Sequence, residues 1–375
     1  MLNALELGCH LVMALGPAPV VMKQSIKENR MLKKKATIIF LILSVSCTIE
    51  RKEELVEIPN ETILEGQPIP INGIGFPSLN MIGDNLIIMN RKDTSLFNIY
   101  ETDNFSRLTS FGLLGNGPNE FSQPTYGTKV NQLGRDNNNI SIHDLETNST
   151  SSIELSNNPA SAPTLVTKKI PNTDAGYVRK VVFETDSTLI FMPENLGRLA
   201  FFNKNSGQTK ITPYIPETKN SVKDQNNWMV YQSEIAVNLD KKLIAAAPIL
   251  LGELDFFDFS GQLVKTIIYD RTNHNSRELS NENVTKSELQ LFTHDIQSTV
   301  NSIFLLITDQ KFTEVRNKSY RNQSRILELD WNGNYLNQYI IGNYSKSFAY
   351  DEKKKAFYIY NIYDEENPLW VYRIK

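Results

Sequence analysis

Histidine and cysteine, the side chains that most often bind metals or act as nucleophiles, are scarce in this chain of 375 residues, which has four histidines and two cysteines. Three of the histidines lie beyond residue 100, at His143, His274 and His294, and none is paired at a metal-ligand spacing. The sequence also lacks a Gly-x-Ser-x-Gly turn, a phosphate-binding loop and a His-Glu-x-x-His helix. We therefore assign no catalytic residue, and we expect no metal and no cofactor.

Carboxylates are the remaining candidates for chemistry, because two of them facing each other can act as general acid and base on a glycosidic bond. Asp144, Glu194, Asp255 and Asp309 each lie in or just after an apolar segment, but their spacing pairs none of them. Most acidic residues of a folded protein are solvated. The sequence therefore favours a protein that is not an enzyme and keeps catalysis as an alternative.

A glycine-rich stretch spans residues 111–124 and could be mistaken for an anion-binding loop, because glycines can aim backbone N–H groups outward. It has no lysine and no helix after it, so we interpret it as a structural turn. We expect its glutamate to bond to nearby backbone and its phenylalanine to pack between two structural units. The residues that define the motif are Gly115, Gly117, Pro118, Glu120 and Phe121.

The N-terminal region has the pattern of an export signal. Three lysines at 33–35 precede an apolar stretch at 36–45 that is too short to span a bilayer, and Ser46 and Cys47 follow. Residues 43–47 resemble a lipobox, in which the cysteine becomes lipidated, although Ser44 departs from the usual aliphatic residue. An ordinary secretory signal with an incidental cysteine is the alternative.

These features predict four regions along the chain. We expect residues 1–30 to lie upstream of the true start codon, with an N-terminal anchor helix as the alternative. Residues 31–47 would be a lipoprotein signal peptide lipidated at Cys47, residues 48–54 a charged tether, and residues 55–375 the folded domain.

Charge and cysteine content restrict the partners of the mature chain. After Cys47 the chain carries 33 Lys and Arg against 40 Asp and Glu, a formal charge of about −7. An acidic chain is a poor partner for nucleic acid. Without a second cysteine it forms no disulfide, so packing alone must stabilise the fold.

The sequence repeats one pattern six times. An apolar strand recurs at intervals of roughly 50 to 60 residues, preceded by a weaker apolar segment and followed by a polar turn and a second strand. A third strand follows in the first five units, and the sixth unit ends with the chain. The recurring strands are Leu86–Met89, Ile140–Ile142, Leu189–Met192, Leu243–Ala247, Ile303–Ile307 and Phe357–Tyr360.

Four antiparallel strands per unit are typical of a β-propeller blade, so we predict an all-β fold with six four-stranded blades. The last blade lacks an outer strand, and an exposed edge invites aggregation. We expect an N-terminal strand, Leu55–Ile63, to close the ring by pairing with Trp370–Ile374.

The motif at residues 111–124 resembles the interblade turn of NHL-like propellers and the Gly-x-Gly-Pro-x-Glu-Phe signature of six-bladed TolB-like propeller lipoproteins of Bacteroidetes. That resemblance implies a bacterial outer membrane lipoprotein that faces the periplasm or the cell surface. Residues 52–54, Lys-Glu-Glu, resemble the acidic tethers of surface-exported lipoproteins, with a solvated linker as the alternative.

Function therefore rests on the propeller's loops. We expect a monomeric binding or sensing protein, held at a membrane by its lipid, for a glycan, peptide or protein ligand. The alternative is a hydrolase or lyase acting on glycan or peptide at the mouth of the central channel. Loops on the rim that carries the blade-to-blade connections are the expected ligand contacts. The residues predicted to bind are Asn90, Arg91, His143, Asp144, Glu194, Asn195, Asp309, Asn361 and Tyr363.

Overall fold

The computed structural model describes most of the chain from Glu53 onward. The chain divides into two units, Met1–Glu50 and Arg51–Lys375, and only the second contains described residues. The lipidation site predicted at Cys47 lies outside them. The described residues are 53–55, 61–71, 75, 77–115, 117, 120–127, 139–155, 161, 163–194, 196–213, 230–271, 290–311, 313–314, 323–342, 344–361, 364 and 366–375.

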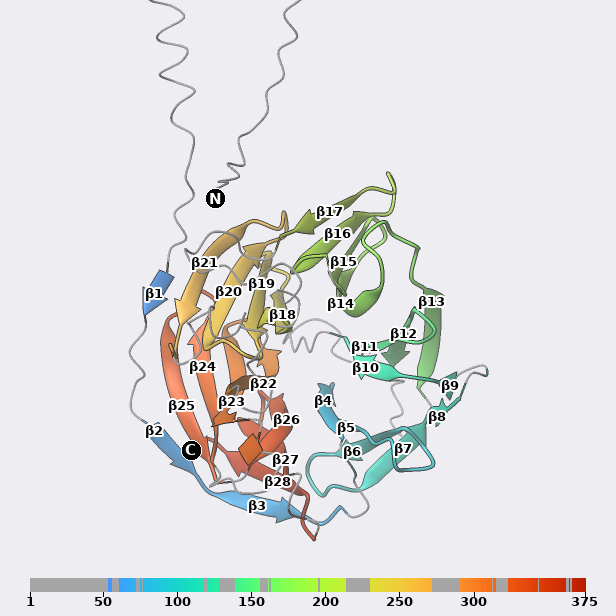
Figure 1. Cartoon of the computed structure of the whole chain (residues 1–375). Coiled ribbons are helices and arrows are strands. Elements are labelled where there is room, and N and C mark those ends of the chain that lie inside the picture. The colour runs from blue at the N-terminus through green and yellow to red at the C-terminus, as the bar shows by residue number, and fades with distance from the viewer. Residues whose placement is uncertain are drawn as a thin grey trace, which may run out of the picture. The chain divides into compact units, whose positions relative to one another are not determined.

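Six small sheets form the blades of a propeller, each with four antiparallel strands that run in order from the centre outward (Figure 1). Blade 1 consists of β4 (Ser78–Ile82), β5 (Asn85–Met89), β6 (Phe97–Glu101) and β7 (Arg107–Phe111). Blade 2 consists of β10 (Pro124–Tyr126), β11 (Asn139–Asp144), β12 (Ser149–Glu154) and β13 (Thr164–Lys169). Blade 3 consists of β14 (Val178–Glu184), β15 (Thr188–Pro193), β16 (Leu199–Asn203) and β17 (Thr209–Thr212). Blade 4 consists of β18 (Ser233–Asn238), β19 (Leu243–Pro248), β20 (Glu253–Asp258) and β21 (Leu263–Ile268). Blade 5 consists of β22 (Gln290–Ser298), β23 (Ser302–Lys311), β24 (Ser324–Asp330) and β25 (Tyr335–Ile341). Blade 6 is β26 (Ser345–Asp351), β27 (Ala356–Asn361), β28 (Leu369–Arg373) and the N-terminal β3 (Gly66–Ile69).

The prediction of an all-β propeller with six blades is confirmed. Each recurring apolar segment of the sequence lies in the second strand of a blade, where its apolar side chains are buried against the neighbouring blades. The tight turns between third and fourth strands contain Gly207, Gly261 and Gly333, whose φ angles of 71°, 81° and 81° suit a residue without Cβ.

The ring is closed by an N-terminal strand, but the segment predicted for it is wrong. β3 pairs antiparallel with β28, from Ile69 opposite Leu369 to Gly66 opposite Tyr372. The earlier strands β1 (Glu53–Leu55) and β2 (Glu61–Leu64) instead add parallel edges to β21 of blade 4 and β25 of blade 5. The closing strand must lead directly into β4, so it is the last of the three, and its Pro68 fits an edge strand.

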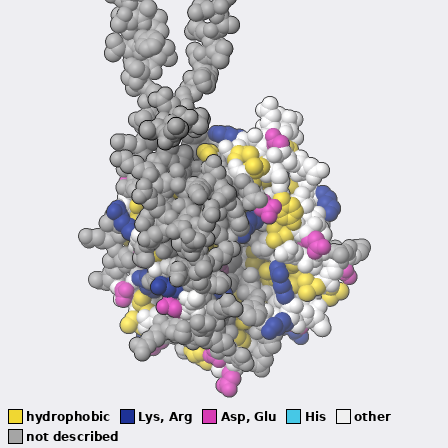
Figure 2. Space-filling view, viewed as in Figure 1, with side chains coloured by type: hydrophobic (Ala, Val, Ile, Leu, Met, Phe, Trp, Pro, Cys, Tyr) yellow, Lys and Arg dark blue, Asp and Glu magenta, His cyan; other side chains and the backbone are white. Residues whose placement is uncertain are grey.

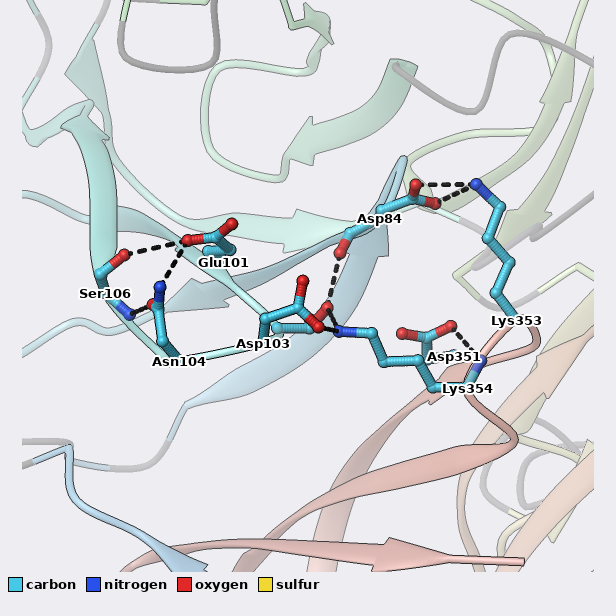
Figure 3. Close-up of polar contacts among 9 residues, drawn as sticks. Asp84, Glu101, Asp103, Asn104, Ser106, Asp351, Lys353 and Lys354 are labelled. Atoms are coloured by element: carbon cyan, nitrogen blue, oxygen red, sulfur yellow. Dashed lines mark hydrogen bonds and ion pairs between the residues drawn. The ribbon is translucent and has the colours of Figure 1, made fainter.

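Successive turns of a blade alternate between the two faces of the ring. We call the face with the blade-to-blade connections the connection face and the opposite one the hairpin face. On the hairpin face, two lysines of blade 6 reach blade 1 (Figure 3): Lys353 Nζ lies 2.7 Å from Asp84 Oδ1, and Lys354 Nζ lies 2.5 Å from Asp103 Oδ1. These pairs are largely exposed, so we expect them to add little stability.

The core lies in the seams between neighbouring blades. In five seams the described residues form hydrophobic clusters to which both blades contribute; the 4/5 seam, for example, contains Phe256, Phe292 and Trp331, each at most 1% exposed. The 2/3 seam differs. Its cluster comes from blade 3 and from Ile170 and Ala175, which follow blade 2.

Candidate ligand-binding site

A cavity of about 400 Å³ lies at the connection face, where the innermost strands of the blades begin. Every blade contributes at least one residue to its lining, so the cavity lies on the axis of the ring. A central cavity that is polar and shared by all blades is a good position for a ligand, because a rigid scaffold holds its walls. The polar side chains at its wall include Ser78, Thr125, Arg179, Lys180, Ser233, Glu234, His294, Asp295, Lys346 and Ser347.

Both carboxylates in this lining are already bound by the protein. Glu234 Oε2 lies 2.7 Å from Lys180 Nζ, across the boundary between blades 3 and 4. Asp295 Oδ2 accepts hydrogen bonds from Ser347 Oγ at 3.1 Å and from the Phe348 backbone N–H at 3.0 Å. These contacts position the walls and leave the carboxylates poorly placed to exchange protons with a substrate.

Two cations of the lining have no such partner within the described part of the chain. Arg179 is the second residue of β14 in blade 3 and Lys346 is the second residue of β26 in blade 6, two blades that face each other across a six-bladed ring. The pKa of Lys346 is lowered from its usual value by partial burial. With Lys180 balanced by Glu234, the cavity wall has a net positive charge of one in an otherwise acidic chain.

His294 is neutral at physiological pH. Burial of its ring, followed by the charge of Lys346, lowers its pKa to about 3. Its Nε2 is 2.7 Å from Thr308 Oγ1 and 3.5 Å from the Tyr344 hydroxyl, and its ring meets Tyr344 edge to face. A neutral histidine held in this way contributes a polar wall and not a charge.

A buried ion pair supports the wall from behind. Arg198 and Asp255, with side chains 1% and 0% exposed, join blades 3 and 4, with Nη1 3.0 Å from Oδ2. The contact has ion-pair distance but not the alignment of a hydrogen bond. Arg198 Nη2 donates to Ser233 Oγ at 3.2 Å, and its guanidinium lies 5.1 Å from the Tyr231 ring centroid. Since Ser233 lines the cavity, the pair fixes the start of β18.

The residues predicted to bind lie near the connection face, but those with described side chains are not part of the cavity lining. Asn90 is 3% exposed and its side-chain oxygen accepts from the backbone of Gly75 and Lys92 at 3.2 and 3.1 Å. The Asp144 carboxylate accepts from the Ser122 backbone N–H at 2.7 Å. These two side chains therefore hold turns in place.

The other predicted residues are more varied. Arg91 is exposed and its Nη2 donates to the Pro124 carbonyl at 2.8 Å. Glu194 is exposed, whereas Asn361 is 8% exposed at the end of β27. Asp309 lies in β23 with its side chain outside the described set, and Asn195 and Tyr363 lie outside the described residues.

His143 is completely buried, and neither of its ring nitrogens has a hydrogen-bond partner of good geometry. Burial lowers its pKa to about 4, while the backbone of Arg179 and the charge of Asp144 act in the opposite direction. The imidazole is therefore neutral at physiological pH and faces blade 3.

The sequence did contain a signal for the cavity residues. The innermost strands of four blades each contain a polar pair that lines the cavity, at Arg179-Lys180, Ser233-Glu234, His294-Asp295 and Lys346-Ser347. The innermost strands of a propeller line its channel, so a polar pair at the same place in successive repeats indicates the channel wall.

The glycine-rich motif forms a turn between blades 1 and 2. Gly117 N–H donates to Glu120 Oε2 at 2.7 Å, and the short strands β8 (Leu113–Leu114) and β9 (Glu120–Phe121) pair. Phe121 is 3% exposed in the 1/2 seam and meets Phe97 edge to face. The motif therefore joins two blades.

Basic and acidic side chains alternate over the visible described surface in Figure 2. Among the described residues, no group of three His, Cys, Asp or Glu side chains is arranged to hold a metal ion. Nor does any helix there have the length and apolarity to cross a membrane.

Comparisons with known proteins agree with this architecture. The structure resembles a member of the DUF4221 family from Bacteroides vulgatus, with a TM-score of 0.52, 10% identity, and coverage of 83% of this chain and 96% of the other. It also resembles a Bacteroides fragilis protein described as exported, with a TM-score of 0.51, 11% identity, and coverage of 86% and 99%. No curated protein sequence is significantly similar to the chain. Residues 77–353 match the family described as TolB-like 6-blade propeller-like, and the chain belongs to that family.

Proposed function

We propose that this propeller is a binding module, and that its ligand is a polar molecule with an acidic group held at the central cavity. The observation that carries the proposal is the pair of cations Arg179 and Lys346, which have no anionic partner among the described residues, in a cavity that all six blades line. A cation at the wall of a cavity gains from pairing with an anion, and a guanidinium can hold a carboxylate through two hydrogen bonds. An acidic glycan or peptide has this chemistry.

The contacts within the cavity favour binding over catalysis. General acid–base catalysis needs a group that can reach the substrate with a pKa near the working pH. Glu234 and Asp295 are bound by the protein's own donors, and the pKa of His294 lies at about 3. A hydrolase or lyase remains the second candidate, with its site at the same mouth.

We also propose that the module works outside the cytoplasm and is lipid-anchored through Cys47. The lysines, apolar stretch and cysteine of residues 33–47 support this location. The fold's likeness to a Bacteroides fragilis protein described as exported agrees with it.

The ligand class can be tested with matched acidic and neutral probes. Trigalacturonate and galactotriose form one pair, and triglutamate and triglutamine peptides form the other; affinities are measured by calorimetry on the full chain in detergent. We expect at least one acidic probe to bind and its neutral partner to bind at least tenfold more weakly, because a charge-assisted hydrogen bond contributes about 1.5–3 kcal/mol.

Two variants assign the binding to the cavity. Arg179→Ala combined with Lys346→Ala should weaken the acidic probe at least tenfold, and neither change removes a side-chain hydrogen bond or ion pair within the described part of the chain. Lys353→Ala removes a lysine on the hairpin face and should leave the affinity unchanged. Equal affinity of the double variant and the wild type would contradict the proposal.

A further inference from the structure

The central cavity is shallow, because each innermost strand, with the residues next to it, contributes only two or three consecutive residues to the lining. Two positions further along the strands of blades 4, 5 and 6, Ala236, Gln297 and Ala349 are each 0% exposed. In blades 1 and 3, Asn80 and Val182 at the same depth are 7% and 4% exposed. Solvent that fills the cavity therefore stops where these residues begin.

Side-chain hydrogen bonds join neighbouring innermost strands at this depth. Gln297 Oε1 accepts the Tyr350 backbone N–H at 2.8 Å, which joins β22 of blade 5 to β26 of blade 6. Ser347 Oγ accepts the Leu79 backbone N–H at 3.0 Å, which joins β26 to β4 of blade 1. These bonds hold three successive blades against one another around the inner end of the cavity.

A second cavity, of about 610 Å³, lies toward the hairpin face, where its lining includes the turn residues Thr185 and Asp186 and also Leu239. Its lining has no residue in common with that of the central cavity. The described part of the ring therefore has a central cavity that opens at the connection face and is closed at its inner end.

A cavity that is closed at its inner end admits a chain by its end more readily than by its middle. A chain held by an internal unit would have to bend and leave through the mouth twice, and ordering that bend costs conformational entropy. The volume of about 400 Å³ lies in the lower part of the range of small-molecule sites, about 300–1,000 Å³. The cavity therefore has room for a short end of a chain, while the rest of the chain extends into solvent.

The lining favours the end of a peptide over the end of a glycan. Every unmodified peptide has a carboxylate at its C-terminal end, whereas a glycan has an acidic group only where a unit is acidic. Arg179 and Lys346 supply two cations for such a carboxylate. The two tyrosines of the lining, Tyr126 and Tyr360, are only 4% and 5% exposed, so they offer little ring surface on which a sugar could stack.

We propose that the central cavity recognises the C-terminal end of a peptide. The α-carboxylate would bind Arg179 and Lys346, and the rest of the peptide would leave through the connection face. This inference rests on the proposed function, because it names the acidic group that the same site binds. Capture of a C-terminal carboxylate is a recurring mode of peptide recognition.

The test compares three peptides that differ in where a carboxylate lies, with affinities measured by calorimetry on the full chain in detergent. The first is N-acetyl-pentaalanine with a free carboxylate, and the second is the same peptide with a C-terminal amide. The third is also amidated but has glutamate at its central position, so it carries the charge of the first peptide at an internal unit. A second set replaces alanine by glutamine. We expect the free-carboxylate peptide of at least one set to bind, and its two partners to bind at least tenfold more weakly.

One variant and one control locate the binding. Arg179→Ala should weaken the free-carboxylate peptide at least tenfold, because the guanidinium that holds its carboxylate is removed. Lys353→Ala removes a lysine on the hairpin face and should leave the affinity unchanged. Unchanged affinity in Arg179→Ala would overturn the inference.

The remaining outcomes separate this inference from the proposed function. Equal affinity for the terminal and the internal carboxylate would overturn C-terminal recognition and leave an acidic ligand in place. Binding of trigalacturonate without binding of either free-carboxylate peptide would overturn it in favour of an acidic glycan. If no acidic probe of any kind binds, both the inference and the proposed function are wrong.

Discussion

Arg198 joins blades 3 and 4 behind the cavity, and replacing it should destabilise the propeller in a way that depends on pH. In Arg198→Met, Asp255 loses its ion pair in a 0% exposed site, while the new side chain can still pack on Tyr231 and Phe257. Removing one member of a buried ion pair typically costs about 3–5 kcal/mol.

The stranded carboxyl sets a limit on this cost, because it can take up a proton instead. Protonating a carboxyl of ordinary pKa near 3.9 at pH 7 costs about 4 kcal/mol, at about 1.4 kcal/mol per pH unit. We therefore expect a loss of about 4 kcal/mol at pH 7. The entropy of unfolding is about 2.1 cal/mol/K per residue, or about 0.7 kcal/mol/K for a domain of about 320 residues. Dividing the loss of about 4 kcal/mol by this entropy gives a fall of about 6 °C in Tm.

The sign of the pH dependence follows because a buried carboxyl that has lost its cationic partner favours its protonated form. A carboxyl whose pKa is higher in the folded state than in the unfolded state loses stability as pH rises above the unfolded pKa. The difference between wild type and Arg198→Met should therefore shrink by about 2–3 kcal/mol from pH 7 to pH 5. Urea unfolding followed by tryptophan fluorescence at the two pH values measures it.

Two controls complete the experiment. Arg198→Met with Asp255→Asn removes both charges and should recover most of the stability. Lys353→Ala breaks an exposed pair on the hairpin face and should leave Tm unchanged. A loss in Arg198→Met that is the same at pH 5 and pH 7 would refute the explanation based on a stranded carboxylate.

Three further predictions concern other parts of the chain. Ile69 in the closing strand is 1% exposed, so Ile69→Ala should lower the free energy of unfolding by about 2–5 kcal/mol in urea denaturation. Ile63 is 78% exposed, so Ile63→Ala should change that free energy by no more than about 0.5 kcal/mol. A larger loss in Ile63→Ala than in Ile69→Ala would mean that β2 closes the ring. His143 has a pKa of about 4 in the folded protein, so the preference for its neutral form stabilises the fold above pH 6.5, and this contribution is lost as the pH falls toward 4. His143→Leu should therefore reduce the pH dependence of the free energy of unfolding between pH 6.5 and 4, measured by urea unfolding. Cys47→Ser should move the protein from the membrane fraction to the soluble fraction on centrifugation, and equal partitioning would show that Cys47 is not a lipid anchor.

The fold could be predicted from sequence because its signals are local and repeated. The second strand of each blade buries its apolar side chains, so it contains an apolar segment such as Leu86–Met89, and six such segments define six blades. The closing strand was missed because Gly66–Ile69 has a glycine, a glutamine and a proline and only one buried residue. Its place depends on pairing with β28, about 300 residues later, which no local pattern records.

The site was harder to predict because the exposure of a side chain and its hydrogen-bond or ion-pair partners depend on tertiary contacts. Asn90 and Asp144 follow the pattern of rim residues, yet their side chains accept backbone N–H groups of adjacent turns. Arg179 and Lys346 lie 167 positions apart and meet at one cavity only because blades 3 and 6 face each other.

Hydrogen–deuterium exchange of the full chain tests most directly whether the ligand binds at the starts of the innermost strands. The measurement compares backbone exchange with and without the acidic probe that binds most tightly. Our account predicts slower exchange in the peptides that contain Arg179–Lys180 and Lys346–Ser347, with little change in the outer strands β7 and β17. Protection confined to the outer strands would contradict a binding site at the central cavity.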